Sequence, residues 1–217
     1  MLSFLAERIY FRDLDQMALH QVASVASPQR VGRGQILALE GEPCRAVYLV
    51  MSGCIQALKM SPEGREQIIG DIGPGEFLYL VPALDDGPLP VTTRALSDTM
   101  LLSFALQDFL ALLSRYPSIS LAVLQSFARR LRQMAALIED LSLRSVSQRL
   151  AKLLLRWAES PNRRRMTQRE MAAQLGTVRE VVARTLSQFE SEGWIVMQRG
   201  RIQVRNLQAL RCEAGEM

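Results

Sequence analysis

The 217-residue sequence is poor in the side chains that carry catalysis and metal binding. It has one histidine, His20, and three cysteines (Cys44, Cys54 and Cys212) whose number and spacing suit neither a metal site nor a disulfide scaffold. Glycine-rich phosphate loops and clustered nucleophile–base pairs are missing too, so we expect no enzyme. Hydrophobic runs fall short of the ~20 residues that span a bilayer, and the first ten residues do not resemble a signal peptide. We therefore expect a cytoplasmic protein that has no membrane partner.

Lysine is scarce as well, because 24 of the 26 basic residues are arginine. The formal net charge of +4 is small, but it is unevenly divided along the chain. Residues 1–143 carry 12 basic and 15 acidic side chains, a net charge of −3. Residues 144–217 carry 14 basic and 7 acidic side chains, a net charge of +7. This division predicts a polyanionic partner for the C-terminal part.

Short apolar segments alternate with turn signals between Val31 and Phe104. Glycine and proline mark the turns, for example at Ser61-Pro-Glu-Gly64, which is typical of a hairpin tip. Such strands at roughly 8–12-residue spacing indicate an antiparallel sandwich or barrel. An N-terminal helix around Leu14–Val22 precedes them, since its apolar residues have helical spacing. The expected strands are Gln35–Leu39, Ala46–Met51, Cys54–Met60, Gln67–Ile72 and Met100–Phe104.

A long helix is predicted after Pro117, because apolar residues recur there at every seventh position. Such a stripe is typical of a helix that packs on a partner helix, which favours a homodimer stalk. The alternative is a helix that lies on the core of its own domain. The expected dimer interface consists of Leu124, Phe127, Leu131, Met134, Ile138 and Leu141.

Two helix starts lie ten residues apart in the last third of the chain, at Thr167-Gln-Arg-Glu170 and Thr177-Val-Arg-Glu180. At each start we expect a capping box, in which threonine and glutamate satisfy each other's backbone amides. Gly176 would end the first helix, because glycine adopts the left-handed conformation without strain. Two short helices joined by such a turn predict a helix-turn-helix. An earlier helix is expected to begin at Ser145.

The second of these helices divides into an apolar and a polar face. Arginine can give paired donors to guanine O6 and N7, and glutamate can accept from cytosine N4, so the polar face suits entry into the major groove of DNA. A charged surface helix that binds no DNA is the alternative. The side chains expected to face the core are Val178, Val182, Leu186 and Phe189. The side chains expected to read base edges are Arg179, Glu180, Arg184 and Ser187.

A β-hairpin around Arg199-Gly200 is predicted directly after this helix, because polar and apolar residues alternate on both sides of the turn. Arginines at its tip are suited to phosphate contacts beside the recognition helix, as in a wing. Arg163-Arg-Arg165 adds to the same basic surface. The residues expected to contact phosphates are Thr167, Gln168, Thr177, Arg199 and Arg201.

The order of these parts resembles the CRP/FNR family of bacterial transcription regulators over nearly the whole chain. The motifs that carry the resemblance are Gly41-Glu42, Val47-Tyr-Leu-Val50, Ser52-Gly53, Gly73-Pro-Gly-Glu-Phe77 and Thr167-Gln-Arg-Glu-Met-Ala-Ala-Gln-Leu-Gly176, with Arg179-Glu180 and Arg184. The resemblance implies an α+β chain with an antiparallel β-roll, the jelly roll of cyclic-nucleotide-binding domains, at residues 1–116. A dimerisation helix and hinge would follow at 117–143, and a winged helix-turn-helix at 144–217.

The same resemblance implies a homodimer on double-stranded DNA. The Arg-Glu-x-x-x-Arg set from Arg179 to Arg184 is similar to the version that reads palindromic TGTGA-like operators. RNA polymerase would be a further partner if the protein is an activator.

The effector pocket that the resemblance implies departs from the pattern of cyclic-nucleotide binders. In those proteins a Gly-Glu pair holds the ribose and an Arg-Ser or Arg-Thr pair holds the phosphate, whereas the aligned positions here are Tyr79-Leu80 and Leu89-Pro90. Burial of a phosphate without arginine is costly, so we expect no cAMP or cGMP. An iron–sulfur cluster is not expected either, because the N-terminus lacks a cysteine cluster. The expected pocket residues are Gly75, Glu76, Leu78, Tyr79, Leu80 and Leu89.

The apolar character of this pocket leaves its occupant open. It is either a collapsed core without ligand or a site for a hydrophobic or planar molecule, including haem. His20 lies on the expected N-terminal helix and is interpreted as a surface residue rather than as an axial ligand. A ligand-binding module whose C-terminal domain binds protein is a second alternative, and the arginine-tipped hairpin counts against it.

Overall fold

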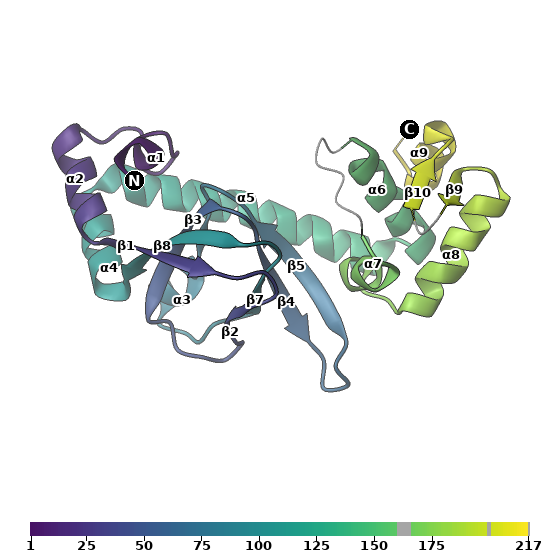
Figure 1. Cartoon of the computed structure of the whole chain (residues 1–217), viewed down its shortest axis with the longest axis horizontal. Coiled ribbons are helices and arrows are strands. Elements are labelled where there is room, and N and C mark those ends of the chain that lie inside the picture. The colour runs from purple at the N-terminus through teal and green to yellow at the C-terminus, as the bar shows by residue number, and fades with distance from the viewer. Residues whose placement is uncertain (160–165, 199–200, 217) are drawn as a thin grey trace. The chain divides into compact units, whose positions relative to one another are not determined.

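The computed structural model describes residues 1–159, 166–198 and 201–216 (Figure 1). The chain divides into two compact units. Unit 1 comprises Met1–Glu63 and Ile68–Arg132, and unit 2 comprises Gly64–Gln67 and Gln133–Met217. Among the described residues, none of the helices combines the length and hydropathy that a membrane crossing requires. The contact-defined boundary after Arg132 lies inside a helix, and the division of the chain at residues 116 and 143 stays a prediction.

Unit 1 is built around two four-stranded antiparallel sheets (Figure 1). Their strand orders are β1-β8-β3-β6 and β2-β7-β4-β5. Each of the five predicted strands is confirmed, and three further strands complete the sheets. The strands are β1 (Ala26–Val31), β2 (Ile36–Ala38), β3 (Ala46–Ser52), β4 (Ile55–Met60), β5 (Glu66–Ile72), β6 (Phe77–Leu78), β7 (Thr92–Ala95) and β8 (Thr99–Ala105).

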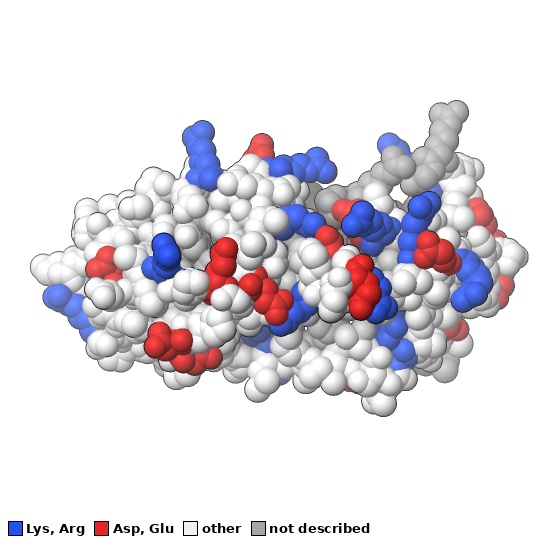
Figure 2. Space-filling model, turned by 90° about the horizontal axis from the view of Figure 1, so that it is seen from below, with Lys and Arg blue, Asp and Glu red and all other residues white. Residues whose placement is uncertain are grey.

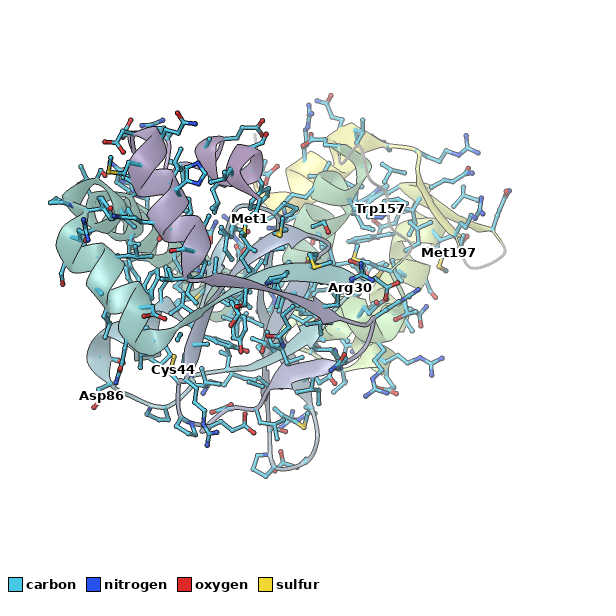
Figure 3. All side chains as sticks on the ribbon, turned by 60° about the vertical axis from the view of Figure 1, so that its left-hand side comes forward. Met1, Arg30, Cys44, Asp86, Trp157 and Met197 are labelled. Atoms are coloured by element: carbon cyan, nitrogen blue, oxygen red, sulfur yellow. The ribbon has the colours of Figure 1, made fainter. Side chains whose placement is uncertain are left out.

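The first of these sheets is buried on both faces. Leu101 of β8 joins the core between the two sheets, whereas Leu102 and Phe104 join a second core on the opposite face, under helices. This is why β8 has consecutive apolar residues rather than strict alternation. Side chains fill the space between the sheets (Figure 3).

Helices cover the outer face of this sheet. Asp15 begins α2, where its carboxylate accepts from the Ala18 amide at 2.7 Å, and the helix confirms the predicted N-terminal helix. Phe109 and Ile119 are buried against the sheet from two further helices. The helices of the chain up to residue 143 are α1 (Leu2–Ala6), α2 (Gln16–Ser24), α3 (Leu80–Asp85), α4 (Leu106–Arg115) and α5 (Pro117–Leu143).

Much of the predicted interface stripe on α5 is exposed in the single chain. Leu124, Leu131 and Ile138 are 63%, 72% and 64% exposed. Leu121, three residues before Leu124 on the same helix, is also exposed. Phe127 differs, because it packs against the core of its own unit. Met134 and Leu141 are half-buried, and the exposed Ala128 and Ala135 occupy the alternate positions of the stripe.

Unit 2 has a core of its own, formed by helices and one small antiparallel sheet. Ser145 caps the first helix, where its hydroxyl accepts from the Gln148 amide at 3.1 Å, as predicted. Leu150, Leu186 and Leu210, from three different helices, are fully buried in this core. The elements are α6 (Val146–Glu159), α7 (Gln168–Leu175), α8 (Arg179–Ser191), β9 (Ile195–Gln198), β10 (Arg201–Val204) and α9 (Leu207–Ala214).

Candidate nucleic-acid interface

The start of α7 has the predicted capping box. The Thr167 hydroxyl accepts from the Glu170 amide at 3.2 Å, and the Glu170 carboxylate accepts from the Thr167 amide at 2.6 Å. Gly176 ends the helix in the left-handed conformation, with φ of 64°. The first half of the predicted helix-turn-helix is therefore confirmed.

The predicted capping box at the start of α8 is wrong. The cap position is Val178, whose side chain gives no capping hydrogen bond. Thr177 is not available as a cap, because its amide donates to the Ala172 carbonyl at 3.0 Å and so belongs to the end of α7. The chain needs one more extended residue before α8 can begin. Val178 is consequently 39% exposed and does not face the core, contrary to the prediction.

The remaining apolar positions anchor α8 as expected. Val182, Leu186 and Phe189 are fully buried. The Phe189 ring also lies 4.9 Å from the Trp194 ring, centroid to centroid, at the start of the hairpin. One face of α8 is thus held firmly, which fixes the direction of the opposite face.

The opposite face of α8 presents Arg179, Glu180, Arg184 and Ser187, all exposed. Within the described part of the chain, neither an ion pair nor a side-chain hydrogen bond engages Arg179, Glu180 or Arg184. The Ser187 hydroxyl donates to the Ala183 carbonyl at 3.1 Å and keeps its lone pairs outward. Three charged side chains are therefore free to meet an external partner.

The two strands of the predicted hairpin follow α8, and the predicted turn at Arg199-Gly200 lies outside the described residues. β9 and β10 pair antiparallel, with Arg201 opposite Gln198. Glu190 near the end of α8 accepts from the Met197 amide at 2.7 Å, which ties the hairpin to the helix. Arg201 is exposed beside the tip, whereas Arg199 and Arg163–Arg165 lie outside the described residues.

The other expected phosphate contacts lie around the same two helices. Thr167 is exposed, and Gln168 and Thr177 are half-exposed. Arg169 is an exposed arginine in the first turn of α7 that the sequence analysis did not single out. Its place two residues after the Thr167 cap was the signal that could have identified it.

Charge is mixed rather than segregated on the face that Figure 2 shows, where basic and acidic side chains lie interspersed. The net charge of +7 on residues 144–217 is therefore an excess within a mixed surface. Recognition by this unit must depend on the geometry of particular side chains as well as on overall charge.

The six expected pocket residues of unit 1 differ in their burial and in the apolar cluster that they join. Leu78 belongs to the core between the sheets, Leu80 belongs to the core under the helices, and Leu89 is buried. Glu76 is exposed, and its carboxylate accepts from the Gly73 amide at 2.7 Å. Gly75 has φ of +86°, which suits the turn that Glu76 closes.

Tyr79 packs against the core between the sheets and has a strained backbone conformation. It has φ of 67°, and among the described residues only Asp86, which closes α3 (Figure 3), shares a positive φ without being glycine. Its hydroxyl shares a hydrogen bond with the Thr93 hydroxyl, and its ring meets the Tyr48 ring edge-on at 5.5 Å. Burial raises the pKa of Tyr79, and the Thr93 hydrogen bond opposes the shift in part. One of the expected pocket residues is thus engaged by other side chains of unit 1.

The other candidate ligands of unit 1 are dispersed. His20 is exposed on α2. Cys44 (Figure 3) is half-buried, and its thiol lies 3.6 Å from the Ala46 carbonyl oxygen. Burial raises the pKa of this thiol, which keeps it protonated. The described residues contain no group of three His, Cys, Asp or Glu side chains that could hold a metal ion.

Comparison with known protein families assigns both parts of the chain. The family model described as "Cyclic nucleotide-binding domain" matches residues 28–116, and the "Crp-like helix-turn-helix domain" matches residues 148–213. The chain is 28% identical over 200 residues to a CRP-like cAMP-activated global transcriptional regulator of Mycobacterium tuberculosis, covering 88% of this chain and 89% of that protein.

Two further relatives cover most of the chain. A cyclic AMP receptor protein of Thermus thermophilus is 31% identical over 175 residues, 80% of this chain and 81% of its own. The structure of CLP, a c-di-GMP-responsive global regulator of Xanthomonas campestris, superposes with a TM-score of 0.79 at 19% identity, covering 88% of this chain and 99% of that one. The fold, the helix-turn-helix and these relatives agree: the chain belongs to the CRP/FNR family of transcription regulators.

Proposed function

We propose that the protein is a homodimeric transcription regulator that binds a palindromic, TGTGA-like operator without cAMP, and that it is not an enzyme. The observation that supports this most strongly is the free polar face of α8. Arg179, Glu180 and Arg184 are exposed, unpaired within the described residues and carried by a helix whose other face is fully buried.

The chemistry of this face suits base readout. A guanidinium gives two parallel donors to guanine O6 and N7, and a carboxylate accepts from the amino group of cytosine. Ser187 and the half-buried Ala183 are small, so the helix backbone can approach the base edges. A helix with two free arginines and a free glutamate therefore fits G·C pairs on both strands of a half-site.

Phosphate contacts would fix the register of this helix on the duplex. Thr167, Gln168, Thr177, Arg199 and Arg201 fill this role in the proposal, and Arg169 joins them. The start of α8 contributes as well, because Val178 leaves its first amides without a side-chain cap. An uncapped helix N-terminus attracts a phosphate group.

Dimerisation follows from the exposed stripe of α5. Leu124, Leu131 and Ile138 expose most of their surface in the single chain, and they recur at the seven-residue spacing of a coiled-coil seam. The symmetric pairing of two α5 helices would present two recognition helices about one DNA turn (~34 Å) apart. A two-fold-symmetric operator is the consequence.

The sensor part of the proposal rests on Tyr79. Its ring and hydroxyl are engaged inside unit 1, beside Thr93 and Tyr48. The two buried leucines on either side, Leu78 and Leu80, offer no charge to a phosphate. We infer that DNA binding does not require cAMP, although curated relatives are named for their response to it.

Fluorescence anisotropy with a palindromic TGTGA duplex tests the function. Specific binding should be at least about 10³-fold tighter than binding to a scrambled duplex of equal length. Its affinity should fall steeply with salt, because phosphate neutralisation releases counterions. Addition of cAMP should leave the affinity unchanged. Equal binding to both duplexes would contradict the operator, and activation by cAMP would contradict the sensor part.

A further inference from the structure

The junction between α5 and α6 carries a cluster of charges within unit 2. The two helices are joined by only two residues, Arg144 and Ser145. Asp140, in the last turns of α5, is the carboxylate that pairs with both Arg144 and Lys152. Its carboxylate lies 3.0 Å from Arg144 Nε and 2.8 Å from Lys152 Nζ on α6. Lys152 reaches both carboxylate oxygens.

Two arginines of the same cluster bind the ends of helices. Arg149 of α6 donates to the backbone carbonyls of Asp140 and Leu141 at 3.2 and 3.1 Å, which are among the last carbonyls of α5. Arg144 donates to the Ala214 carbonyl at 2.6 Å, at the end of α9. Both contacts place a cation where the helix dipole is negative.

These contacts are partly shielded from water. The side chains of Asp140, Arg144 and Lys152 are 16%, 24% and 22% exposed. An ion pair of this kind is costly to break from one side, because the remaining charge stays buried without a partner. The cluster therefore resists rotation about the two-residue junction. An ion pair between the same charges on the surface would resist this rotation little, because water screens it.

We propose that Asp140, Arg144, Arg149 and Lys152, here named the Asp140 clamp, lock α6 and α9 onto the last turns of α5 and so hold the helix-turn-helix at a fixed angle to that end of the predicted dimer helix. Asp140 acts as a positioning residue rather than as a contact to DNA. The expected effect on DNA binding rests on the proposed function, since a fixed orientation of the helix-turn-helix matters when a dimer binds two half-sites together.

A fixed angle has a specific effect on affinity. When both helix-turn-helices of the dimer are preoriented, the binding of one half-site holds the second helix-turn-helix near the other half-site at a high effective concentration. When the junction between α5 and α6 is free to rotate, each helix-turn-helix still binds one half-site, but the dimer loses this gain in effective concentration. The clamp should therefore affect binding to a palindrome and leave binding to a single half-site unchanged.

The angle itself can be measured without DNA. Nitroxide labels are attached at Gln133 on α5 and at Gln208 on α9 of the full-length chain, after its three cysteines have been replaced by serine. The labelled protein is diluted with unlabelled protein, so that pulsed electron resonance reports only the distance between the two labels of one chain. We expect a narrow distribution for the parent protein and a broad one for Asp140→Asn. Lys152→Met, which keeps the packing of the side-chain stem, should broaden it in part. A narrow distribution in Asp140→Asn would overturn the proposal.

The matched control is Glu139→Gln. Glu139 is the neighbouring carboxylate, is 54% exposed and contacts Arg144 at 3.3 Å. This variant should keep the narrow distribution, and an equal broadening in it would also overturn the role of Asp140. Circular dichroism of each variant identifies any loss of folding.

Binding to DNA completes the test. Asp140→Asn should weaken binding to a palindromic TGTGA duplex about tenfold or more and change binding to a single half-site less than about twofold. Equal losses on both probes would refute the positioning role. If the parent protein distinguishes neither probe from scrambled DNA, the proposed function fails, and the distance measurement still decides on the clamp.

Discussion

Replacement of Leu131 by alanine should weaken the proposed dimer strongly. Full burial of a leucine side chain is worth about 1.5–3 kcal/mol. Leu131 is 72% exposed in the single chain, so its burial by a partner helix would contribute about 1–2 kcal/mol per protomer. A two-fold interface contains this residue twice, which doubles the contribution to about 2–4 kcal/mol. The dissociation constant should rise by about 30- to 1000-fold.

Sedimentation equilibrium over a range of concentrations measures this change. Leu143→Ala is the matched control, because Leu143 is an equally exposed leucine of α5, at 78%, that does not lie on the seven-residue stripe. This variant should keep the dissociation constant of the parent protein. Unchanged self-association of Leu131→Ala, or an equal loss in both variants, would refute the assignment of the stripe as the dimer seam.

Three further substitutions probe the two units. Thr167→Ala removes the α7 capping box and should lower the free energy of unfolding by about 1 kcal/mol. Calorimetry should show a thermal unfolding midpoint that is lower by a few degrees, and an unchanged midpoint would contradict the role of the cap. Arg184→Ala should cost about 1–3 kcal/mol on the operator and relax preference at one base pair, whereas uniform weakening on every sequence would contradict base readout. Burial raises the pKa of Tyr79, so above about pH 10 the unfolded chain loses the Tyr79 proton before the folded chain does, and the free energy of unfolding falls as the pH rises. Tyr79→Phe should make this fall shallower in alkaline denaturation curves.

The sequence analysis predicted the elements whose local chemistry is complete within a few residues. The Thr167 capping box, the end of α7 at Gly176 and the Ser145 cap each need only neighbouring side chains, and all three are confirmed. It failed at the start of α8, where two helices compete for one residue. The Thr177 amide completes α7, so Val178 becomes the cap.

Some elements that depend on tertiary pairing were not predicted. β1 contains Pro28 and has buried residues only at its ends, and it is a strand because it pairs with β8 at the edge of a sheet. α3 contains Leu80 of the expected apolar pocket, and its Pro82 lies in the first turn, where proline is tolerated. Arg144 of the Asp140 clamp also bonds the Ala214 carbonyl, 70 positions away, and no local pattern could predict that contact.

The most direct test of the central claim is selection of DNA from a random pool by the full-length protein. The free face of α8 and the seam of α5 predict enrichment of a two-fold-symmetric sequence with TGTGA-like half-sites whose centres lie about one helical turn apart. Enrichment in the absence of any nucleotide would also support the proposal that DNA binding does not require cAMP. Recovery of no common sequence, or of a single asymmetric motif, would contradict the account.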